Sequence, residues 1–207
     1  MNAECSGCPA CEPLRTQVAA QQQEISDLTD NSTRHDALTG ALNRRSLTEV
    51  VTHELQRSSR TGQPFCFAMI GVDHLKAIND KFGVDTGDEV LKTIASESCI
   101  LLRTLDSFGR TEQDEFGIVL PTTWLHQGVQ AMNRLNVFIA NFDWNSVTAG
   151  QSVTFSTGLT SNAPAETADA MIQRARKAML QAKQEGRNRL VTLEEDLPAG
   201  LFAAMED

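Results

Sequence analysis

The spacing of hydrophobic positions divides the chain into a helical N-terminal segment and a longer region of mixed helices and strands. In the first segment the seam residues recur at intervals of four, three, four and three, with one polar member: Leu14, Val18, Gln21, Ile25 and Leu28. This is a heptad pattern of about two repeats. Two interpretations stay open, a short parallel coiled coil that pairs two chains and a helix packed on its own domain.

From Arg34 onward the pattern predicts a compact α/β domain. Residues 65–72 form a continuous apolar run between Pro64 and Asp73, which is typical of a central strand. Alternating positions at 153, 155 and 157 predict a half-buried strand. Further elements are expected as helices over 46–59, 90–102, 125–139 and 171–182, a hairpin of 107–110 and 115–120, and a last strand over 190–193. The expected order of elements is α-β-α-α-β-β-α-β-α-β. Both tryptophans, Trp124 and Trp144, are expected to be core or half-buried anchors.

Length and charge narrow the class of protein. A chain of 207 residues suits one domain with an accessory segment, and no apolar run approaches the ~20 residues that span a bilayer. The start of the chain lacks a secretory signal pattern, so we expect a cytoplasmic protein without a membrane partner. A net charge of −9 argues against general binding to nucleic acid. The predicted division begins with a cysteine-containing tail (1–12) and a helical segment with its linker (13–33). The domain (34–193) and an acidic tail (194–207) follow.

The two tails carry weaker signals. Cys5, Cys8 and Cys11 have overlapping C-x-x-C spacings, which suit zinc, an iron–sulfur cluster or a redox pair, yet one chain offers only three ligands. A reduced tail without a metal is the open alternative, while Cys66, in an apolar run, is expected in the core. The acidic tail EEDLPAGLFAAMED has apolar residues at 197, 201, 202 and 205. It predicts either a short docking helix or a frayed terminus.

Four sequence blocks carry the chemistry. They are DALTGALNRR (36–45), VDHLKAINDKFGVDTGDEVL (72–91), RTLDSFGRTEQDEFGIVL (103–120) and AKQEGRNRL (182–190). In this order and spacing they resemble the GGDEF family, bacterial diguanylate cyclases that join two GTP molecules into cyclic di-GMP. The resemblance covers residues 34–193. It implies a mixed sheet flanked by helices, similar to the nucleotide cyclase and polymerase palm.

The turn in the third block departs from the family pattern. Asp114, Glu115 and Phe116 match, but Glu112 and Gln113 stand where the family has two glycines. Those glycines let the backbone approach a triphosphate closely. The family's first metal-binding Asp aligns with Gly71, so a hard cation such as Mg²⁺ loses an oxygen ligand. We expect a loss of several kcal/mol, or about a thousandfold or more in rate, and Asp114 and Glu115 are expected to be catalytic remnants.

The GTP side of the family site is retained in part. By the resemblance, Asn79 and Asp88 contact guanine, and the phosphates are contacted by Lys76, Lys183 and Arg187. The alternative is that Asn79 caps a turn, that Asp88 caps the following helix and that the cations are solvated. The last helix carries Arg176 in place of a family Asp, which relaxes the demand on this pocket. Whether GTP still binds stays open.

The inhibitory product site of the family is retained. Arg103 and Asp106 form its Arg-x-x-Asp pair, and Arg134 stands at the position of a second contacting arginine. An arginine fork suits O6 and N7 of guanine, while a carboxylate accepts from N1–H and N2–H. The alternative is an ordinary i,i+3 surface ion pair between Arg103 and Asp106.

Three hypotheses follow. The first is an enzymatically silent receptor that binds cyclic di-GMP at Arg103, Asp106 and Arg134 and signals through its N-terminal helix or tail. The second is an interaction module without a nucleotide, which pairs as a homodimer or heterodimer through the helical segment. The third is a slow diguanylate cyclase. No cofactor is required, and Mg²⁺ is needed only in the third case.

Overall fold

The structure, a computed structural model, describes residues 17–18 and 34–195. The predictions for Cys5, Cys8 and Cys11 lie outside the described residues and stay predictions. The same holds for most of the heptad segment and for residues 196–207.

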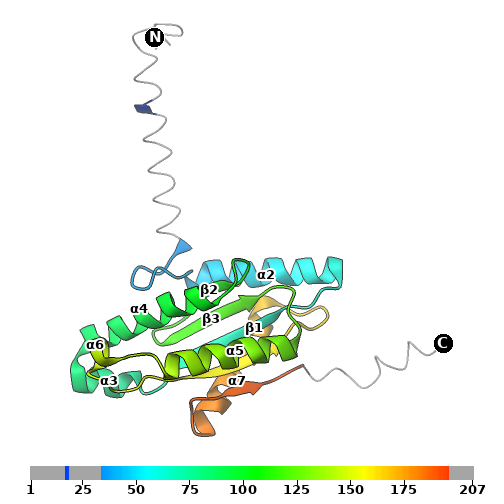
Figure 1. The fold of residues 1–207 in the computed structure, drawn as a ribbon. Helices are drawn as coiled ribbons and strands as arrows, with labels where there is room; N and C mark the ends of the chain where they lie inside the picture. Colours follow the sequence, from blue (N-terminus) through cyan, green and yellow to red (C-terminus); the bar gives the residue numbers. More distant parts are fainter. Residues whose placement is uncertain (1–16, 19–33, 196–207) are drawn as a thin grey trace, which may run out of the picture.

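Residues 34–195 fold around one five-stranded sheet (Figure 1). The helices are α2 (Arg44–Thr61), α3 (Leu75–Phe82), α4 (Val84–Leu101), α5 (Leu125–Ala140), α6 (Asn145–Thr148) and α7 (Ala168–Gln184). The strands are β1 (Cys66–Val72), β2 (Ser107–Arg110), β3 (Glu115–Leu120), β4 (Phe155–Ser161) and β5 (Leu190–Thr192). The predicted order is confirmed apart from α6, whose single turn is too short to leave a periodic pattern.

The sheet is mixed, as the resemblance implies. Its strand order is β2-β3-β1-β4-β5, with β1 in the middle and antiparallel to both β3 and β4. The pair β4 and β5 is parallel. Because β1 has a strand on each side and helices over both faces, every one of its residues is buried, in agreement with the continuous apolar run.

Successive side chains of β1 point to opposite faces and hold two separate cores together. Cys66, Ala68 and Ile70 pack with α4 and α5, which cross one face of the sheet in Figure 1. Phe67 and Met69 pack with α2 and α7 on the other face. Complete burial stabilises by about 1.5–3 kcal/mol for each large apolar side chain. Burial also raises the pKa of the Cys66 thiol to about 12.

The prediction of a half-buried strand near 153–157 is wrong. Residues Phe155–Thr160 of β4 are all buried, because α5 covers one face and α7 the other. Gly158 permits this packing, since a Cβ there would lie 2.1 Å from the carbonyl oxygen of Ala175 in α7. The alternating pattern was misleading because the polar residues of this strand are buried as well. Thr157 is one of them, and its Oγ1 donates to Asn136 at 3.0 Å.

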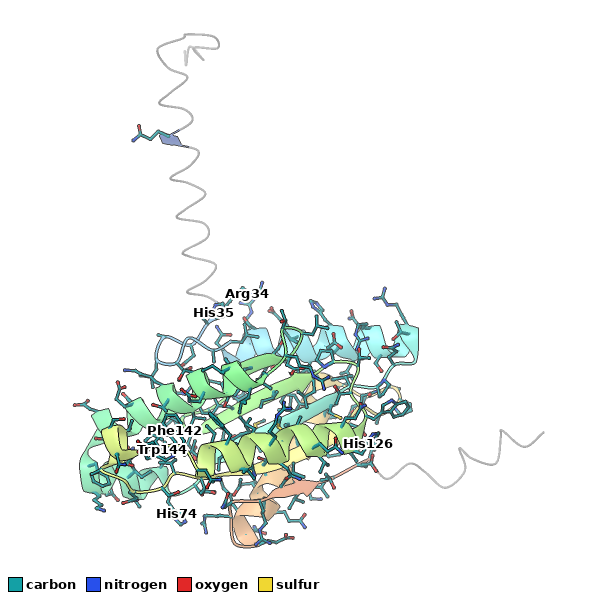
Figure 2. All side chains as sticks on the ribbon, viewed as in Figure 1. Arg34, His35, His74, His126, Phe142 and Trp144 are labelled. Carbon is teal, nitrogen blue, oxygen red and sulfur yellow. The ribbon has the colours of Figure 1, made fainter. Side chains whose placement is uncertain are left out.

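The two tryptophans differ. Trp144 is buried, donates from Nε1 to the carbonyl of Ile139 at 3.0 Å and meets the ring of Phe142 edge-on, as expected (Figure 2). The expectation for Trp124 is wrong: its exposed fraction is 59%. Trp124 is the N-cap of α5, so its side chain projects where the helix begins rather than over the sheet. In the described part of the chain, no helix combines the length and apolarity that a bilayer crossing needs.

Candidate functional site

The end of β1 meets the β2–β3 turn and the side of α7 in a cluster of charged side chains. We call this cluster the carboxylate corner and define it by Gly71, Asp114, Glu115, Arg176 and Lys183. Gly71 is paired with Glu115 in the β1–β3 register, and the Val72 amide donates to the Asp114 carbonyl at 2.9 Å. Arg176 and Lys183 are seven residues apart on α7, about two turns, so both reach the same side of that helix.

Lys183 fills the space next to Gly71. Its ammonium lies 3.3 Å from the Asp114 carboxylate. A Cβ added to Gly71 would lie 2.6 Å from Cε and 2.7 Å from Nζ of Lys183. A longer acidic side chain at position 71 therefore requires Lys183 to move. In this fold a lysine ammonium supplies the positive charge beside Asp114, at the end of the strand where the resemblance implies a metal ion.

Arg176 neutralises the second carboxylate. Glu115 is buried, and its carboxylate is 3.2 Å from Arg176 through both Oε1 and Oε2. The contact with Oε1 has hydrogen-bond geometry, whereas the contact with Oε2 is an ion pair only. Burial raises the pKa of the Glu115 carboxyl, and the positive charge of Arg176 opposes that rise without cancelling it.

The turn itself is tied down by arginines. Arg44 lies 2.8 Å from the Glu112 carboxylate, and Arg176 lies 4.0 Å from it. Arg110 donates from Nε to the Glu112 carbonyl at 3.2 Å and from Nη2 to the Gln113 carbonyl at 2.7 Å. Among the described residues, the ion-pair partners of the Glu112 carboxylate are therefore guanidinium groups.

The same arginine joins the turn to the opening sequence block. Arg110 donates from Nη1 to the Asp36 carboxylate at 3.1 Å. Burial pushes the pKa of the Asp36 carboxyl upward, but hydrogen bonds from Thr39 and Arg110 outweigh it, so the net pKa is lowered. Arg110 thus connects the carbonyl groups of the turn with the opening sequence block and fixes the conformation of the turn.

These residues do not fit a divalent cation. Asp114 and Glu115 are paired with Lys183 and Arg176, and Gly71 brings no oxygen ligand. Among residues 17–18 and 34–195, no group of three or more His, Cys, Asp or Glu side chains is arranged to hold a metal ion. Asp73, the other acidic residue at the end of β1, is buried and accepts from Thr154 Oγ1 at 2.8 Å and Ser156 Oγ at 2.7 Å. Its carboxylate therefore links the end of β1 to the start of β4.

The residues predicted for GTP lie on α3, α4 and α7 and in the turn after α7. Asn79 on α3 packs against Gly87 of α4, where a Cβ would lie 1.8 Å from Asn79 Oδ1, so Asn79 and Asp88 share one helix junction. Asn79 Oδ1 is buried without a hydrogen-bond partner among the described residues. Lys76 on α3 and Arg187 in the turn after α7 are exposed. Lys183 is engaged by Asp114, so a phosphate would compete with that carboxylate.

A second set of predicted residues does come together. The loop after α4 and the middle of α5 line a small pocket that includes Arg103, Asp106 and Arg134, and we call this site the arginine pocket. The loop is locked locally: the Arg103 amide donates to Asp106 Oδ2 at 2.8 Å, and the Asp106 amide donates to the Arg103 carbonyl at 2.9 Å. The Arg103–Asp106 contact is therefore a backbone clamp, not the side-chain ion pair considered above.

The arginine side chains of this pocket are unneutralised. Neither Arg103 nor Arg134 makes an ion pair with any residue that the structure describes, and Arg134 only donates to the Leu101 carbonyl at 3.3 Å. Burial raises the pKa of the Asp106 carboxyl, opposed by the Arg103 amide and by both arginine charges. Both guanidinium groups are exposed. The pocket offers two cationic forks beside one carboxylate, and its cavity of about 10 Å³ is too small to enclose a ligand.

Sequence reasoning missed the pairing in the carboxylate corner. Arg176 was noticed as a departure from the family pattern, and Lys183 was assigned to a phosphate, but neither was connected with the turn. The usable signal combines three features: relative to the family pattern that the resemblance implies, position 71 lacks an acid and position 176 carries a cation, and Arg176 and Lys183 lie on one side of a helix. Arg44 and Arg110 gave no separate signal.

Comparison with known proteins places this geometry in context. The family model described as "Diguanylate cyclase, GGDEF domain" matches residues 33–189. Diguanylate cyclase DgcP of Pseudomonas aeruginosa is 39% identical over 155 residues, which is 75% of this chain and 23% of that protein. Response regulator PleD of Caulobacter vibrioides is 31% identical and covers 86% of this chain. The chain spans about two fifths or less of the length of these relatives.

Solved structures agree on the fold. Diguanylate cyclase SiaD of P. aeruginosa, in complex with its activator SiaC, has a TM-score of 0.75 at 35% identity and covers 89% of this chain and 72% of SiaD. A microbial GGDEF domain with bound cyclic di-GMP has a TM-score of 0.67 at 27% identity, over 80% of this chain and 99% of that domain.

Proposed function

This chain belongs to the GGDEF family, and we propose that it is a member without cyclase activity that binds cyclic di-GMP as a receptor. The proposed site is the arginine pocket of Arg103, Asp106 and Arg134. One observation carries the proposal. The carboxylates of the carboxylate corner are neutralised from within the chain, while the guanidinium groups of the arginine pocket form no salt bridge with any described residue.

The chemistry of the pocket suits a guanine dinucleotide. Arg103 and Arg134 provide planar forks that bond O6 and N7 of guanine and stack on the bases. Asp106 uses Oδ2 for the Arg103 amide, which leaves Oδ1 to accept from N1–H or N2–H of a guanine. A ligand with two guanines and two phosphates can engage both arginines at once from the surface, whereas the cavity is too small to enclose a single small molecule.

Loss of catalysis follows from the other corner. Phosphoryl transfer in this family of reactions depends on positioning and on metal ions that neutralise the triphosphate. A metal at Asp114 would have to displace the Lys183 ammonium, and it would still lack a carboxylate at position 71. Glu112 and Gln113 further crowd the approach that two glycines leave open.

The test is calorimetric titration of cyclic di-GMP into the nucleotide-free full chain. We expect binding by the wild type and a loss of about 10–100-fold in Arg103→Ala, equivalent to the ~1.5–3 kcal/mol of a hydrogen bond to a charged group. Arg45→Ala is the matched control, because Arg45 is an exposed arginine that pairs with Glu49 on α2. A folded, ligand-free wild type that gives no heat would refute the receptor function.

The alternative supported by the family membership is a slow diguanylate cyclase. Its signature is formation of cyclic di-GMP from labelled GTP with Mg²⁺ or Mn²⁺, abolished by Asp114→Ala. We expect no product above the background of that variant.

An interaction module is the second candidate, favoured by one observation: the related SiaD was solved with a protein activator. In that case the helical segment 13–33 would pair two chains or a partner. Self-association measured by light scattering, unchanged by cyclic di-GMP and by Arg103→Ala, would support this function over the receptor.

A further inference from the structure

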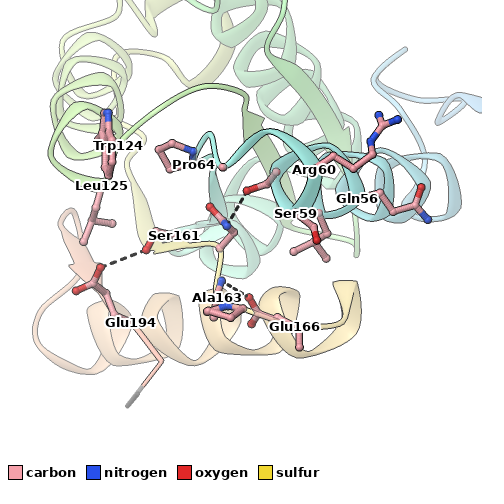
Figure 3. A pocket seen from close by; sticks show the side chains of 16 residues that line it. Gln56, Ser59, Arg60, Pro64, Trp124, Leu125, Ser161, Ala163, Glu166 and Glu194 are labelled. Carbon is pink, nitrogen blue, oxygen red and sulfur yellow. Dashed lines mark hydrogen bonds between the residues drawn. The ribbon is translucent and has the colours of Figure 1, made fainter. Parts of the chain in front are cut away.

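A groove lies at the ends of β1 and β4 that are opposite to the carboxylate corner. The register of β1 with β4 places Ser161 beside Cys66 at one end and Ser156 beside Gly71 at the other. The groove opens at the Ser161 end, between the last turns of α2, the start of α5 and the loop before α7, with a volume of about 1110 Å³ (Figure 3). This volume lies slightly above the ~300–1000 Å³ range of small-molecule pockets, which leaves room for several side chains.

The wall of the groove is apolar at one end and basic at the other. Figure 3 shows Trp124 and Leu125 on the same side of the groove as Glu194. Arg60 lies on the far side, and Pro64 lies between Trp124 and Arg60. Trp124 is 59% exposed, a large apolar side chain without cover from described residues. Arg60 is the only cation among the described lining residues and makes no ion pair with them. Glu166 is already neutralised by Arg174.

The described chain leaves the domain at this groove. The Leu193 amide donates to the Leu159 carbonyl at 3.0 Å, and Ser161 Oγ donates to the Glu194 carboxylate at 3.2 Å. Glu194 lines the groove, and Glu195 is the last described residue of this stretch. The next twelve residues, 196–207, read DLPAGLFAAMED. Extended, they reach about 40 Å, which is close to the ~39 Å diameter of a sphere with the radius of gyration of such a domain.

We propose that residues 196–207 dock into this groove of the same chain. Leu197, Leu201 and Met205 are spaced by four residues, with Phe202 beside them, which is the spacing of one apolar face. The order along the segment matches the order along the groove: apolar residues come first, near Trp124 and Leu125, and Glu206 and Asp207 come last, near Arg60. Because Glu194 tethers the segment at the entrance, its effective concentration is high and a weak contact suffices. This inference is independent of the proposed ligand.

The first test is quenching of tryptophan emission by acrylamide in the full chain. Trp144 is buried, so quenching reports mainly on Trp124. We expect Leu201→Asp/Phe202→Asp to raise the quenching constant about twofold, because the indole ring regains contact with solvent. Ala203→Asp is the matched control, since it adds an acid off the apolar face, and should behave as the wild type. Equal quenching in all three proteins would overturn the proposal.

The second test examines the register through charge. Arg60→Glu should increase quenching of Trp124, and combining it with Glu206→Lys/Asp207→Lys should restore the wild-type value. Arg45→Glu, an exposed change in the first turn of the same helix, should have no effect. Absence of restoration would refute the register. Protection of Trp124 that grows with protein concentration, together with a doubled mass in light scattering, would refute docking within one chain in favour of a second copy.

Discussion

The carboxylate corner and the arginine pocket contain the same kinds of charged groups but differ in where the counter-charges come from. In the corner, Asp114 lies against Lys183 and Glu115 against Arg176, both on α7. In the pocket, Arg103 and Arg134 have no acidic side-chain partner among the described residues, and Asp106 accepts only a backbone amide. Charges that are paired internally have little to gain from a ligand, whereas unpaired cations on a surface have much to gain from an anionic one.

The carboxylate corner contains a buried carboxylate whose charge has to be balanced. Losing an acid at position 71 would leave fewer negative charges, but a buried carboxylate at 115 still needs a cation. Arg176 supplies it, and Lys183 occupies the adjacent space. The corner has become a structural ion-pair cluster that holds the β2–β3 turn against α7.

Returning an acid to the corner should give the largest effect. Gly71→Asp should destabilise the fold by about 1–3 kcal/mol, because the new side chain overlaps Lys183 and the sulfur of Met179. Adding Lys183→Ala should recover part of that loss, since it removes the overlapping side chain. Chemical denaturation of the single and double variants measures the coupling.

The same double variant tests the pairing directly. With Lys183 removed and an acid restored, Mn²⁺ should raise the melting temperature, while the wild type should be indifferent to it. A rise in the wild type, or additive free energies without coupling between positions 71 and 183, would contradict the role given to Lys183.

An acidic partner for Arg134 should make the arginine pocket resemble the carboxylate corner, where the charges are paired within the chain. Phe138→Glu places an acid four residues after Arg134 on α5, where the two side chains face each other. We expect affinity for cyclic di-GMP to fall by about tenfold, because the ligand must break a new ion pair worth up to ~1 kcal/mol and meets a new negative charge. Asn133→Glu adds the same charge without facing Arg134, so a calorimetric loss of equal size there would argue against a specific pairing effect.

Acidification should weaken the pocket selectively. Burial raises the pKa of Asp106 above its ordinary value of 3.8, and a protonated carboxyl group accepts less well from guanine N–H groups. Affinity should therefore fall as pH decreases through that raised pKa. Asp106→Asn should bind weakly at every pH, with a flat profile. A wild-type profile equally flat in titrations would remove Asp106 from the site.

The smallest expected effect is on the half-buried ion pair of Lys183 with Asp114. Lys183→Met should change the free energy of unfolding by less than about 1 kcal/mol, because Asp114 is 39% exposed and solvent screens the pair. Thermal or chemical denaturation of this variant measures it. A loss of several kcal/mol would mean that Lys183 supports the fold more deeply than its contacts indicate.

The fold was largely predictable because periodicity and the four motif blocks agree. The run 65–72 identified the central strand, and α2 extends beyond its predicted bounds only as far as its caps, Asn43 and Gly62. Trp124 and β4 were misjudged because polarity patterns do not tell which faces helices cover. The arginine pocket was predictable from spacing, whereas the pairing of Lys183 with Asp114 was not, because the two residues are 69 positions apart.

Native mass spectrometry of the full chain, mixed with equal amounts of cyclic di-GMP and GTP in the presence of Mg²⁺, compares the two sites in a single spectrum. We predict adducts of cyclic di-GMP on the wild type, none on Arg103→Ala, and no GTP adduct on either. A wild-type chain that carries GTP with magnesium, or converts it into cyclic di-GMP while the arginine pocket stays empty, would contradict that assignment of the two sites.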